Sequence, residues 1–184
     1  MTSGYRLEKI TEFADLAWVH TPVFNDPRGW LSERYSRPAF EGLGLPDLVQ
    51  DNSSFTRSRG TVRGLHFQTP PHAQAKLFRV IRGWVLNIAL DLREPHFGFV
   101  TTHEMDEDSP WIFIPEGAAH GFQSLTADVE ILYKCSRPFS PGHLGQIAHD
   151  DAALSLRLPL IVPPETRSER DALNRPLADW RGVF

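Results

Sequence analysis

The sequence predicts an all-β fold, a sandwich or barrel of jelly-roll type with a few short helical turns. Its 184 residues include 15 prolines and 13 glycines, spaced at the short intervals at which turns separate short strands. The runs between them are rich in β-branched and aromatic residues, which favour strands, whereas helical patterns are scarce. No repeat, low-complexity stretch or linker divides the chain. We therefore expect one domain over residues 1–184, with room for a ligand-sized cavity.

The strands are expected wherever such a run lies between turn residues. Leu16–Phe24 is the first, and the turn residues 25–29 (Asn-Asp-Pro-Arg-Gly) separate it from Trp30–Tyr35. Arg82-Gly83 separates two later runs as a tight hairpin does. The later strands are expected at Leu48–Phe55, Thr61–Gln68, Ala75–Ile81, Trp84–Leu92, Phe99–Met105, Trp111–Ile114, Gly121–Leu125, Val129–Cys135, Gln146–His149 and Ser155–Leu158.

Helices contribute little to this prediction. One or two helical turns are expected at Arg37–Leu43, and Ser168 is a candidate cap for a short helix with Glu169 and Asp171 in its first turn. Because the edge strands of a jelly roll are free to pair with a second copy, we expect a homodimer.

The composition excludes several classes of partner. With 19 basic and 23 acidic residues the formal net charge is −4, which gives no general attraction to nucleic acid or to an anionic membrane. The single cysteine, Cys135, excludes an internal disulfide and fits a reducing compartment. The first residues lack the apolar core of a signal peptide, and no run approaches the roughly 20 apolar residues of a membrane helix. We expect a cytoplasmic protein.

Polar side chains on one strand face indicate a ligand cavity. Side chains alternate along a strand, so His66 and Gln68 share a face opposite to Leu65 and Phe67. On the following strand Lys76 shares a face with apolar residues, and a buried lysine is costly unless it is paired or borders a wet pocket. Such a mixture is typical of ligand cavities.

Each of these residues also has a plainer explanation when it is taken alone. A single histidine in a strand is more often structural, and Lys76 alone fits a solvated edge-strand lysine. Tyr133 alone fits a core aromatic, and Asp171 fits a charge at a helix start. Only their joint occurrence favours a functional site.

A second motif, Pro115-Glu116-Gly117-Ala-Ala-His120-Gly121-Phe122, resembles the second signature motif of the cupins. Metal-binding cupins supply two histidines as His-x-His, then a glutamate, then a histidine from this motif. Here the first element is His66-x-Gln68, so one ligand is missing and we expect no metal. Taken alone, His120 fits a hydrogen-bonded turn residue equally well.

The order of the motifs resembles one family. The segments are Phe24-x-Asp26-x-Arg28-Gly29 with Glu33, Gln50-Asp51-Asn52, Arg63-Gly64-Leu65-His66-Phe67-Gln68, Gln74-x-Lys76, Ile114 to Phe122, Tyr133-Lys134 and Ser168-x-x-Asp171. Together they resemble the dTDP-4-dehydrorhamnose 3,5-epimerases from about Leu16 to Asp179. The resemblance implies a homodimeric cupin jelly roll that acts without a cofactor on a nucleotide-linked 4-keto-6-deoxy sugar.

The resemblance also implies roles for individual residues. His66 matches the catalytic base, Asp171 its paired carboxylate, Tyr133 the acid on the opposite face and Lys76 the residue near the keto oxygen. His120 matches a pocket histidine beside the substrate, and Gln68 lies on the same strand face as the base. The positions that match contacts to the nucleotide and its diphosphate, some of them reached from a neighbouring subunit, are Arg28, Glu33, Gln50, Asn52 and Arg63.

These residue types suit the chemistry of epimerisation. A 4-keto group acidifies the hydrogens at C3 and C5, because the carbanion becomes an enolate. Histidine, with an ordinary pKa of about 6.5, suits the base, and a carboxylate fixes its tautomer. A fixed ammonium stabilises the oxyanion, and a phenol delivers the proton from the other side.

The sequence departs from the family pattern in the part of the site concerned with the nucleotide. Pro138 stands where a tyrosine is usual and Leu144 where a glutamate is usual, while Leu31 and Ser53 replace a phenylalanine and a histidine. The nucleotide could therefore differ from dTDP, or only one carbon could be inverted. The rival hypotheses are a nucleotide-sugar 3,4-ketoisomerase, a metal-dependent cupin and a non-catalytic sugar-binding module.

Overall fold

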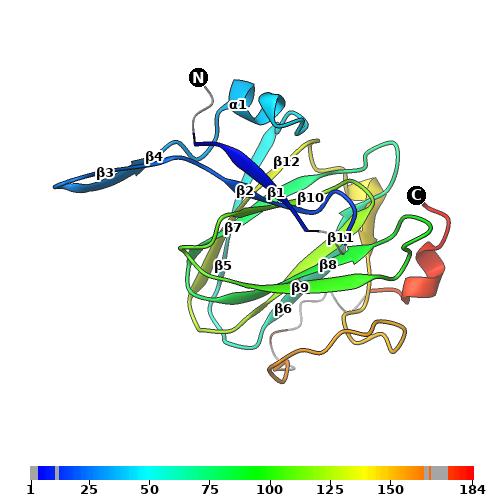
Figure 1. Cartoon of the computed structure of the whole chain (residues 1–184). Helices are drawn as coiled ribbons and strands as arrows, with labels where there is room; N and C mark the ends of the chain where they lie inside the picture. Colours follow the sequence, from blue (N-terminus) through cyan, green and yellow to red (C-terminus); the bar gives the residue numbers. More distant parts are fainter. Residues whose placement is uncertain (1–3, 11–12, 164–165, 167–173) are drawn as a thin grey trace.

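The computed structural model describes residues 4–10, 13–163, 166 and 174–184, and in this part of the chain two antiparallel sheets pack face to face (Figure 1). The six-stranded sheet has the order β1 (Arg6–Lys9), β2 (Ala17–His20), β10 (Trp111–Ile114), β7 (Lys76–Arg82), β12 (Val129–Cys135) and β5 (Gln50–Thr56). The five-stranded sheet has the order β13 (Leu144–Gln146), β6 (Val62–Gln68), β11 (Ala118–Ser124), β8 (Val85–Asp91) and β9 (Val100–Met105). The all-β cupin jelly roll expected from the sequence is confirmed.

Alternation along the strands creates the core between the sheets. Phe78 of β7 and Ile131 of β12 face inward from one sheet, and Ala89 of β8 and Phe122 of β11 meet them from the other. All four are buried, as the period of two predicts for strands that bury one face against a second sheet.

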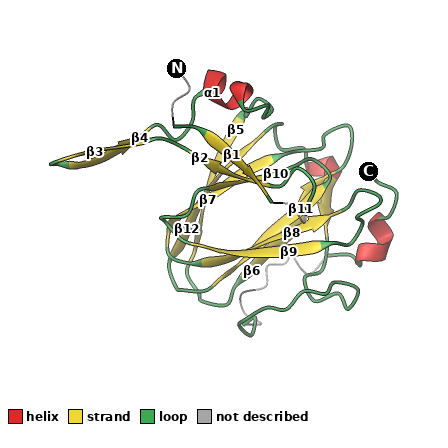
Figure 2. Cartoon of the chain, viewed as in Figure 1, coloured by secondary structure: helices red, strands yellow, loops and turns green. Residues whose placement is uncertain are grey.

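The outer faces of both sheets are covered as well. The short helix α1 (Arg37–Gly42) packs Phe40 onto the six-stranded sheet. On the five-stranded sheet, Phe67 of β6 contacts the rings of Trp180 and Phe184, at centroid distances of 4.9 and 6.0 Å, beside the 3-10 turn Leu177–Trp180. Figure 2 shows how little of the chain is helical. The outer face of β6 is therefore covered by residues 177–184.

One hairpin stands apart from the sandwich. Strands β3 (Val23–Asp26) and β4 (Gly29–Ser32) pair with each other and project from the body (Figure 1). The single strand predicted at Leu16–Phe24 is therefore wrong, since β2 ends before Pro22, which has no N–H for a ladder. The hairpin exposes large apolar side chains, with Trp30 64% and Leu31 69% exposed.

The predicted hairpin at Arg82-Gly83 is also wrong. Strands β7 and β8, which flank it, belong to different sheets, so the chain turns a corner there. Gly83 has φ +85°, and its N–H donates to Oε2 of Glu107 at 3.1 Å. The local signal identifies a turn but not the partner of each strand.

Smaller differences concern strand ends. Residues 155–158 form no strand, because Leu156 and Leu158 instead pack irregularly against the outer core. Strand β11 begins at Ala118, so His120 lies within a strand and not in a turn, and β13 ends at Gln146, where the predicted strand begins. Strand β1 was not predicted, and a short 3-10 turn at Pro141–His143 was missed. The helix predicted from Ser168 lies outside the described residues.

Candidate active site

Between the sheets lies a cavity with two lobes that share His66, Lys76 and Tyr133. One lobe, of about 320 Å³, we call the amide lobe, and its other lining residues are Gln50, Asn52, Phe67, Gln68, Gln74, Cys135, Phe139 and Leu144. The second, of about 250 Å³, we call the histidine lobe, and its other lining residues are Ser54, Arg63, Phe78, His120, Gly121, Phe122 and Ile131.

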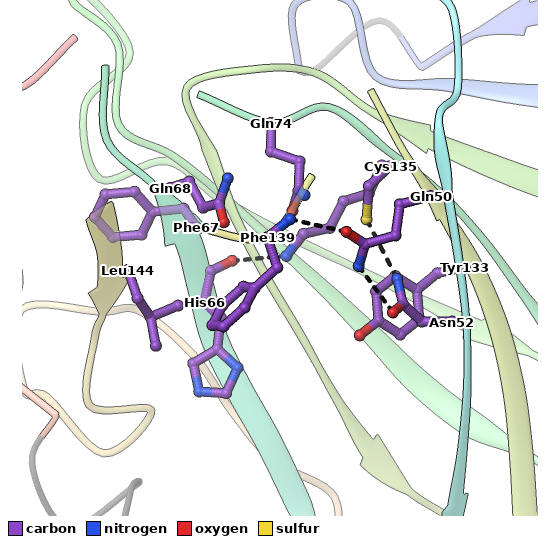
Figure 3. Close-up of a pocket in the computed structure, with 11 residues that line it drawn as sticks. Gln50, Asn52, His66, Phe67, Gln68, Gln74, Tyr133, Cys135, Phe139 and Leu144 are labelled. Carbon is purple, nitrogen blue, oxygen red and sulfur yellow. Dashed lines mark hydrogen bonds between the residues drawn. The ribbon is translucent and has the colours of Figure 1, made fainter. Parts of the chain in front are cut away.

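The three shared residues come from both sheets. His66 belongs to β6 of the five-stranded sheet, whereas Lys76 and Tyr133 belong to β7 and β12 of the six-stranded sheet. Figure 3 shows the rings of His66 and Tyr133 on opposite sides of the pocket. A ligand that lies between the sheets at this point is flanked by imidazole on one side and phenol on the other.

A register shift in β6 brings Arg63 onto the cavity beside His66. His120 of β11 lies opposite His66, but Phe122 lies opposite Arg63, so two residues of β6 match the single residue Gly121. This bulge reverses the alternation, which would otherwise turn Arg63 to the outer face. Gly64 in the bulge has φ +117°, and a Cβ there would lie 2.7 Å from both the Cα of Gly121 and the carbonyl oxygen of His120. Glycine is required at this crossing of β6 and β11.

Lys76 is a buried cation. Its Nζ donates to the backbone carbonyl oxygen of His66 at 3.0 Å, and no described carboxylate forms a salt bridge with it. Burial lowers the pKa of its ammonium group, and the nearby Cys135 thiol acts weakly in the opposite sense. The group is placed to meet a negative charge that develops within the cavity.

The surroundings of His120 disfavour the charged form of its imidazole. It is buried, its Nε2 lies 2.8 Å from Oδ1 of Asn87, and the ring meets Phe78 at a centroid distance of 4.9 Å. Burial, followed by the charges of Lys76 and His66, lowers the pKa of His120 well below its ordinary value. The ring therefore offers the cavity a polar atom without a charge.

Tyr133 retains its proton at neutral pH. Burial is the main cause that raises the pKa of its phenol, Cys135 adds to the rise, and Arg63 opposes it. A phenol that stays protonated has a proton to give, which is the state that a general acid needs.

His66 contacts the short strand β13. Nε2 of Gln146 lies 3.4 Å from Nε2 of His66 and 3.2 Å from Oδ1 of Asn174. Asp171, the predicted partner of His66, lies outside the described residues.

The amides of the amide lobe hold the segment 137–140 in place. Gln68 donates to the carbonyl oxygen of His72 at 2.8 Å and accepts from the N–H of Ser140 at 2.7 Å. Gln50 accepts from the N–H of Phe139 at 2.8 Å and donates to Asn52 at 2.9 Å. Gln68 thus lines the cavity, as the strand alternation predicts, but its amide is engaged by backbone groups.

Two predicted contact residues lie away from this cavity. Arg28 sits at the tip of the β3–β4 hairpin, with its side chain 89% exposed and 2.7 Å from Asp26. Glu33 follows the hairpin and accepts a hydrogen bond from the hydroxyl of Tyr5. Neither lines the cavity of its own chain.

Several residues that line the cavity, or that contact its histidines from behind, were not predicted from the sequence. Cys135 lies two positions after Tyr133 on the same strand face, which is a signal that alternation offers. Asn87 is a polar residue in the otherwise apolar run Val85–Leu90, which is another signal. The contributions of Phe139 and Gln146 depend on tertiary contacts and had no comparable signal.

Two further observations concern the described residues as a set. No three His, Cys, Asp or Glu side chains among them gather in an arrangement that could hold a metal ion. No helix in the described part of the chain has the length and apolar character needed to cross a bilayer.

The chain is similar to known proteins in both sequence and structure. Residues 10–179 match the family model described as dTDP-4-dehydrorhamnose 3,5-epimerase. A protein of that name from Pseudomonas aeruginosa is 40% identical over 178 residues, which cover 93% of this chain and 97% of that protein. The crystal structure of the Bacillus anthracis enzyme of that name, with TDP and PPi bound, has a TM-score of 0.87 at 31% identity, covering 94% of this chain and 99% of that one.

A third similar structure carries a sugar nucleotide. It is the dTDP-6-deoxy-D-glucose-3,5-epimerase of Legionella pneumophila in complex with dTDP-4-keto-L-rhamnose. Its TM-score is 0.85 at 30% identity, and the match covers 95% of this chain and 93% of that one.

Proposed function

The chain belongs to the dTDP-4-dehydrorhamnose 3,5-epimerase family and is an isomerase, and on this premise we propose that it inverts C3, C5 or both in a nucleotide-linked 4-keto-6-deoxyhexose by acid–base catalysis without metal. The observation that carries the proposal is the shared part of the cavity, where His66 and Tyr133 face each other across the space that Lys76 also lines. The sugar ring is assigned to this space.

In the proposed mechanism His66 removes the proton next to the ketone from one face of the ring. Lys76 stabilises the negative charge that develops on the keto oxygen; one preorganised donor of this kind is commonly worth about 2.7–4 kcal/mol. Tyr133 returns a proton from the opposite face. Asp171 is proposed to orient His66 and to stabilise its imidazolium form.

The nucleotide is assigned to the side of the amide lobe. Gln50 and Asn52 supply amide groups there, Phe139 supplies an aromatic ring, and Leu144 contributes an uncharged wall. Arg63 lines the histidine lobe, where its guanidinium also bonds Thr56 and the carbonyl oxygen of Phe55, and it is proposed to meet the phosphate next to the sugar. Because Leu144 and Pro138 depart from the family pattern, the nucleotide is left open between dTDP and related diphosphates.

We further propose that the active form is a homodimer. Three features support it: the apolar side chains exposed on the β3–β4 hairpin, the outer edge of β5, which has no described partner strand, and Arg79, whose Nη1 has no described hydrogen-bond partner. Arg79 lies in a surface hollow of about 610 Å³ that Trp30 of the hairpin also lines. Since the family resemblance assigns some nucleotide contacts to a neighbouring subunit, Arg28 and Glu33 of the second copy are proposed to reach the cavity.

The dimer is tested by the mass in solution. Light scattering should give twice the chain mass of 20.9 kDa, and Leu31→Glu should shift the equilibrium to the monomer. Ile161→Glu is the matched control, because Ile161 is 92% exposed and distant from the hairpin in sequence; it should leave the mass unchanged. A monomeric wild type would contradict the proposal.

The cytoplasm is the proposed compartment. The chain has one cysteine, and it is a buried free thiol, which suits a reducing environment.

The epimerase activity is tested by solvent exchange. The protein is incubated in heavy water with dTDP-, CDP-, GDP- and UDP-linked 4-keto-6-deoxyhexoses, and deuterium at C3 and C5 is followed by mass spectrometry and NMR. Incorporation above the rate without protein, with at least one nucleotide, is expected. No exchange with any of the four would contradict the proposal, and a carbonyl moved from C4 to C3 would identify a ketoisomerase instead.

Three variants test the assigned roles. His66→Ala should lower the exchange rate by about 10²-fold or more, and Asp171→Asn should lower it markedly without unfolding the protein. Tyr133→Phe should retain exchange through His66 but lose inverted product. His96→Ala, at an exposed histidine outside the cavity, is the control and should react at the wild-type rate. A near-normal rate for His66→Ala would remove the assigned base.

A further inference from the structure

Asn87 of β8 lies in the core and contacts His120, a residue that lines the histidine lobe. Its side chain is fully buried on the same face of β8 as Val85 and Ala89. Its Oδ1 lies 2.8 Å from Nε2 of His120, while its Nδ2 has no hydrogen-bond partner among the described residues. The contact with His120 is therefore the described hydrogen bond of this side chain.

The contact fixes the state of the imidazole. With Oδ1 of Asn87 facing the ring, Nε2 of His120 is the donor and carries the hydrogen, and a neutral imidazole then has an unprotonated Nδ1. No described residue forms a hydrogen bond with Nδ1, and the ring lines the histidine lobe. The free lone pair is available to a ligand in that lobe.

We propose that Asn87 is a positioning residue: it holds His120 as the neutral Nε2–H tautomer, so that Nδ1 accepts a hydrogen bond from a hydroxyl group of the bound sugar. This inference rests on the proposed function, because it needs the sugar to extend into the histidine lobe.

The surrounding charges explain why an amide suits this position. Lys76 of β7, His66 and Arg63 of β6 and Tyr133 of β12 line the same lobe, and no described carboxylate does. A carboxylate at position 87 would stabilise an imidazolium, as it does in His–Asp pairs. His120 lies directly opposite His66, and a charge on His120 would make His66 a weaker base. The amide orients the ring and leaves it uncharged.

The wild-type protein provides the first test, and it needs no substrate. In protein with ¹⁵N-labelled histidine, His120 should show a protonated Nε2 and an unprotonated Nδ1 at every pH from about 5.5 to 9, across the ordinary pKa of histidine. A protonated Nδ1, or titration near about 6.5, would overturn the inference. The ¹⁵N spectrum does not depend on turnover, so its outcome is separate from that of the deuterium experiment. Absence of exchange would contradict the epimerase assignment, whereas a wrong tautomer would contradict only the role of Asn87.

The variant Asn87→Asp provides the second test. His120 should become protonated in neutral solution, kcat/KM should fall by about 10-fold or more, and the loss should shrink as the pH is raised and the imidazolium loses its proton. In a His120→Ala background the same substitution should have little effect, because Asn87 acts through His120. An equal loss in both backgrounds would indicate a structural role only. Should Asn87→Asp fail to fold, the wild-type spectrum still decides.

Discussion

Replacing Lys76 with methionine should give a protein that is more stable and much less active. Lys76 is only 9% exposed, and no described carboxylate forms a salt bridge with it. Its ammonium group is therefore poorly hydrated and lacks a compensating negative charge. Methionine has a similar length, no charge and an adaptable side chain that suits a buried position.

The size of the effect follows from two opposing contributions. Keeping an ammonium group out of water costs several kcal/mol, while its described hydrogen bond, 3.0 Å to the carbonyl oxygen of His66, returns about 1.5–3 kcal/mol. Removing both should raise the free energy of unfolding by about 1–3 kcal/mol at neutral pH.

The pH dependence provides an internal check. Burial lowers the pKa of Lys76 in the folded state below its value of 10.5 in an open chain, so in between the unfolded state binds more protons. Stability of the wild type should then rise with pH toward about 10.5, by at most about 1.4 kcal/mol per pH unit from this group. The methionine variant lacks that rise, so its advantage should shrink in alkali.

Urea unfolding followed by tryptophan fluorescence at two pH values, together with the deuterium assay, measures both effects. The exchange rate should fall by about 10²-fold or more, since the proposed donor to the keto oxygen is lost. Lys9→Met, at an exposed lysine of β1, is the control and should change stability by less than about 0.5 kcal/mol. A Lys76→Met protein that is less stable than wild type, or that keeps most of its activity, would refute this reasoning.

Three further substitutions test other parts of the structure. Gly64→Ala should lower the free energy of unfolding by about 3 kcal/mol or more in urea titrations, because the new Cβ meets backbone atoms and the residue has φ +117°. Gly42→Ala is the control: no atom lies close to a Cβ there, so the free energy of unfolding should change by less than about 1 kcal/mol. Folding lowers the pKa of His120, so below about pH 6.5 the unfolded state takes up a proton that the folded state does not. The free energy of unfolding should therefore decrease as the pH is lowered through this range. His120→Gln should remove that part of the acid slope, and an unchanged slope would contradict the assignment. Gln68→Leu should raise KM more than it lowers kcat in steady-state kinetics, because the bond that holds Ser140 is lost; an unchanged KM would argue against this role.

The sequence predicts the strands well where each is bounded by turn residues and alternates cleanly. Strands β10 and β12 begin and end at the predicted residues, and the inward faces of His66, Lys76 and Tyr133 follow from alternation alone. These features depend only on neighbours along the chain.

What the sequence could not predict depends on partners distant in the chain. The bulge that turns Arg63 inward exists because Gly64 of β6 crosses Gly121 of β11, and neither segment shows this alone. The corner at Gly83 looks like a hairpin until β7 and β8 are assigned to different sheets. The partner of Asn87 became visible only once β8 and β11 were paired.

The packing of the last residues behind β6 has a consequence for synthesis. Phe67, next to the proposed base, rests on Trp180 and Phe184, which leave the ribosome more than a hundred residues later. The wall that carries His66 therefore lacks its backing until those residues emerge. During translation the nascent chain should remain inactive, and a ribosome stalled shortly before Trp180 should display a sandwich in which β6, the strand of the proposed base, is still loosely held.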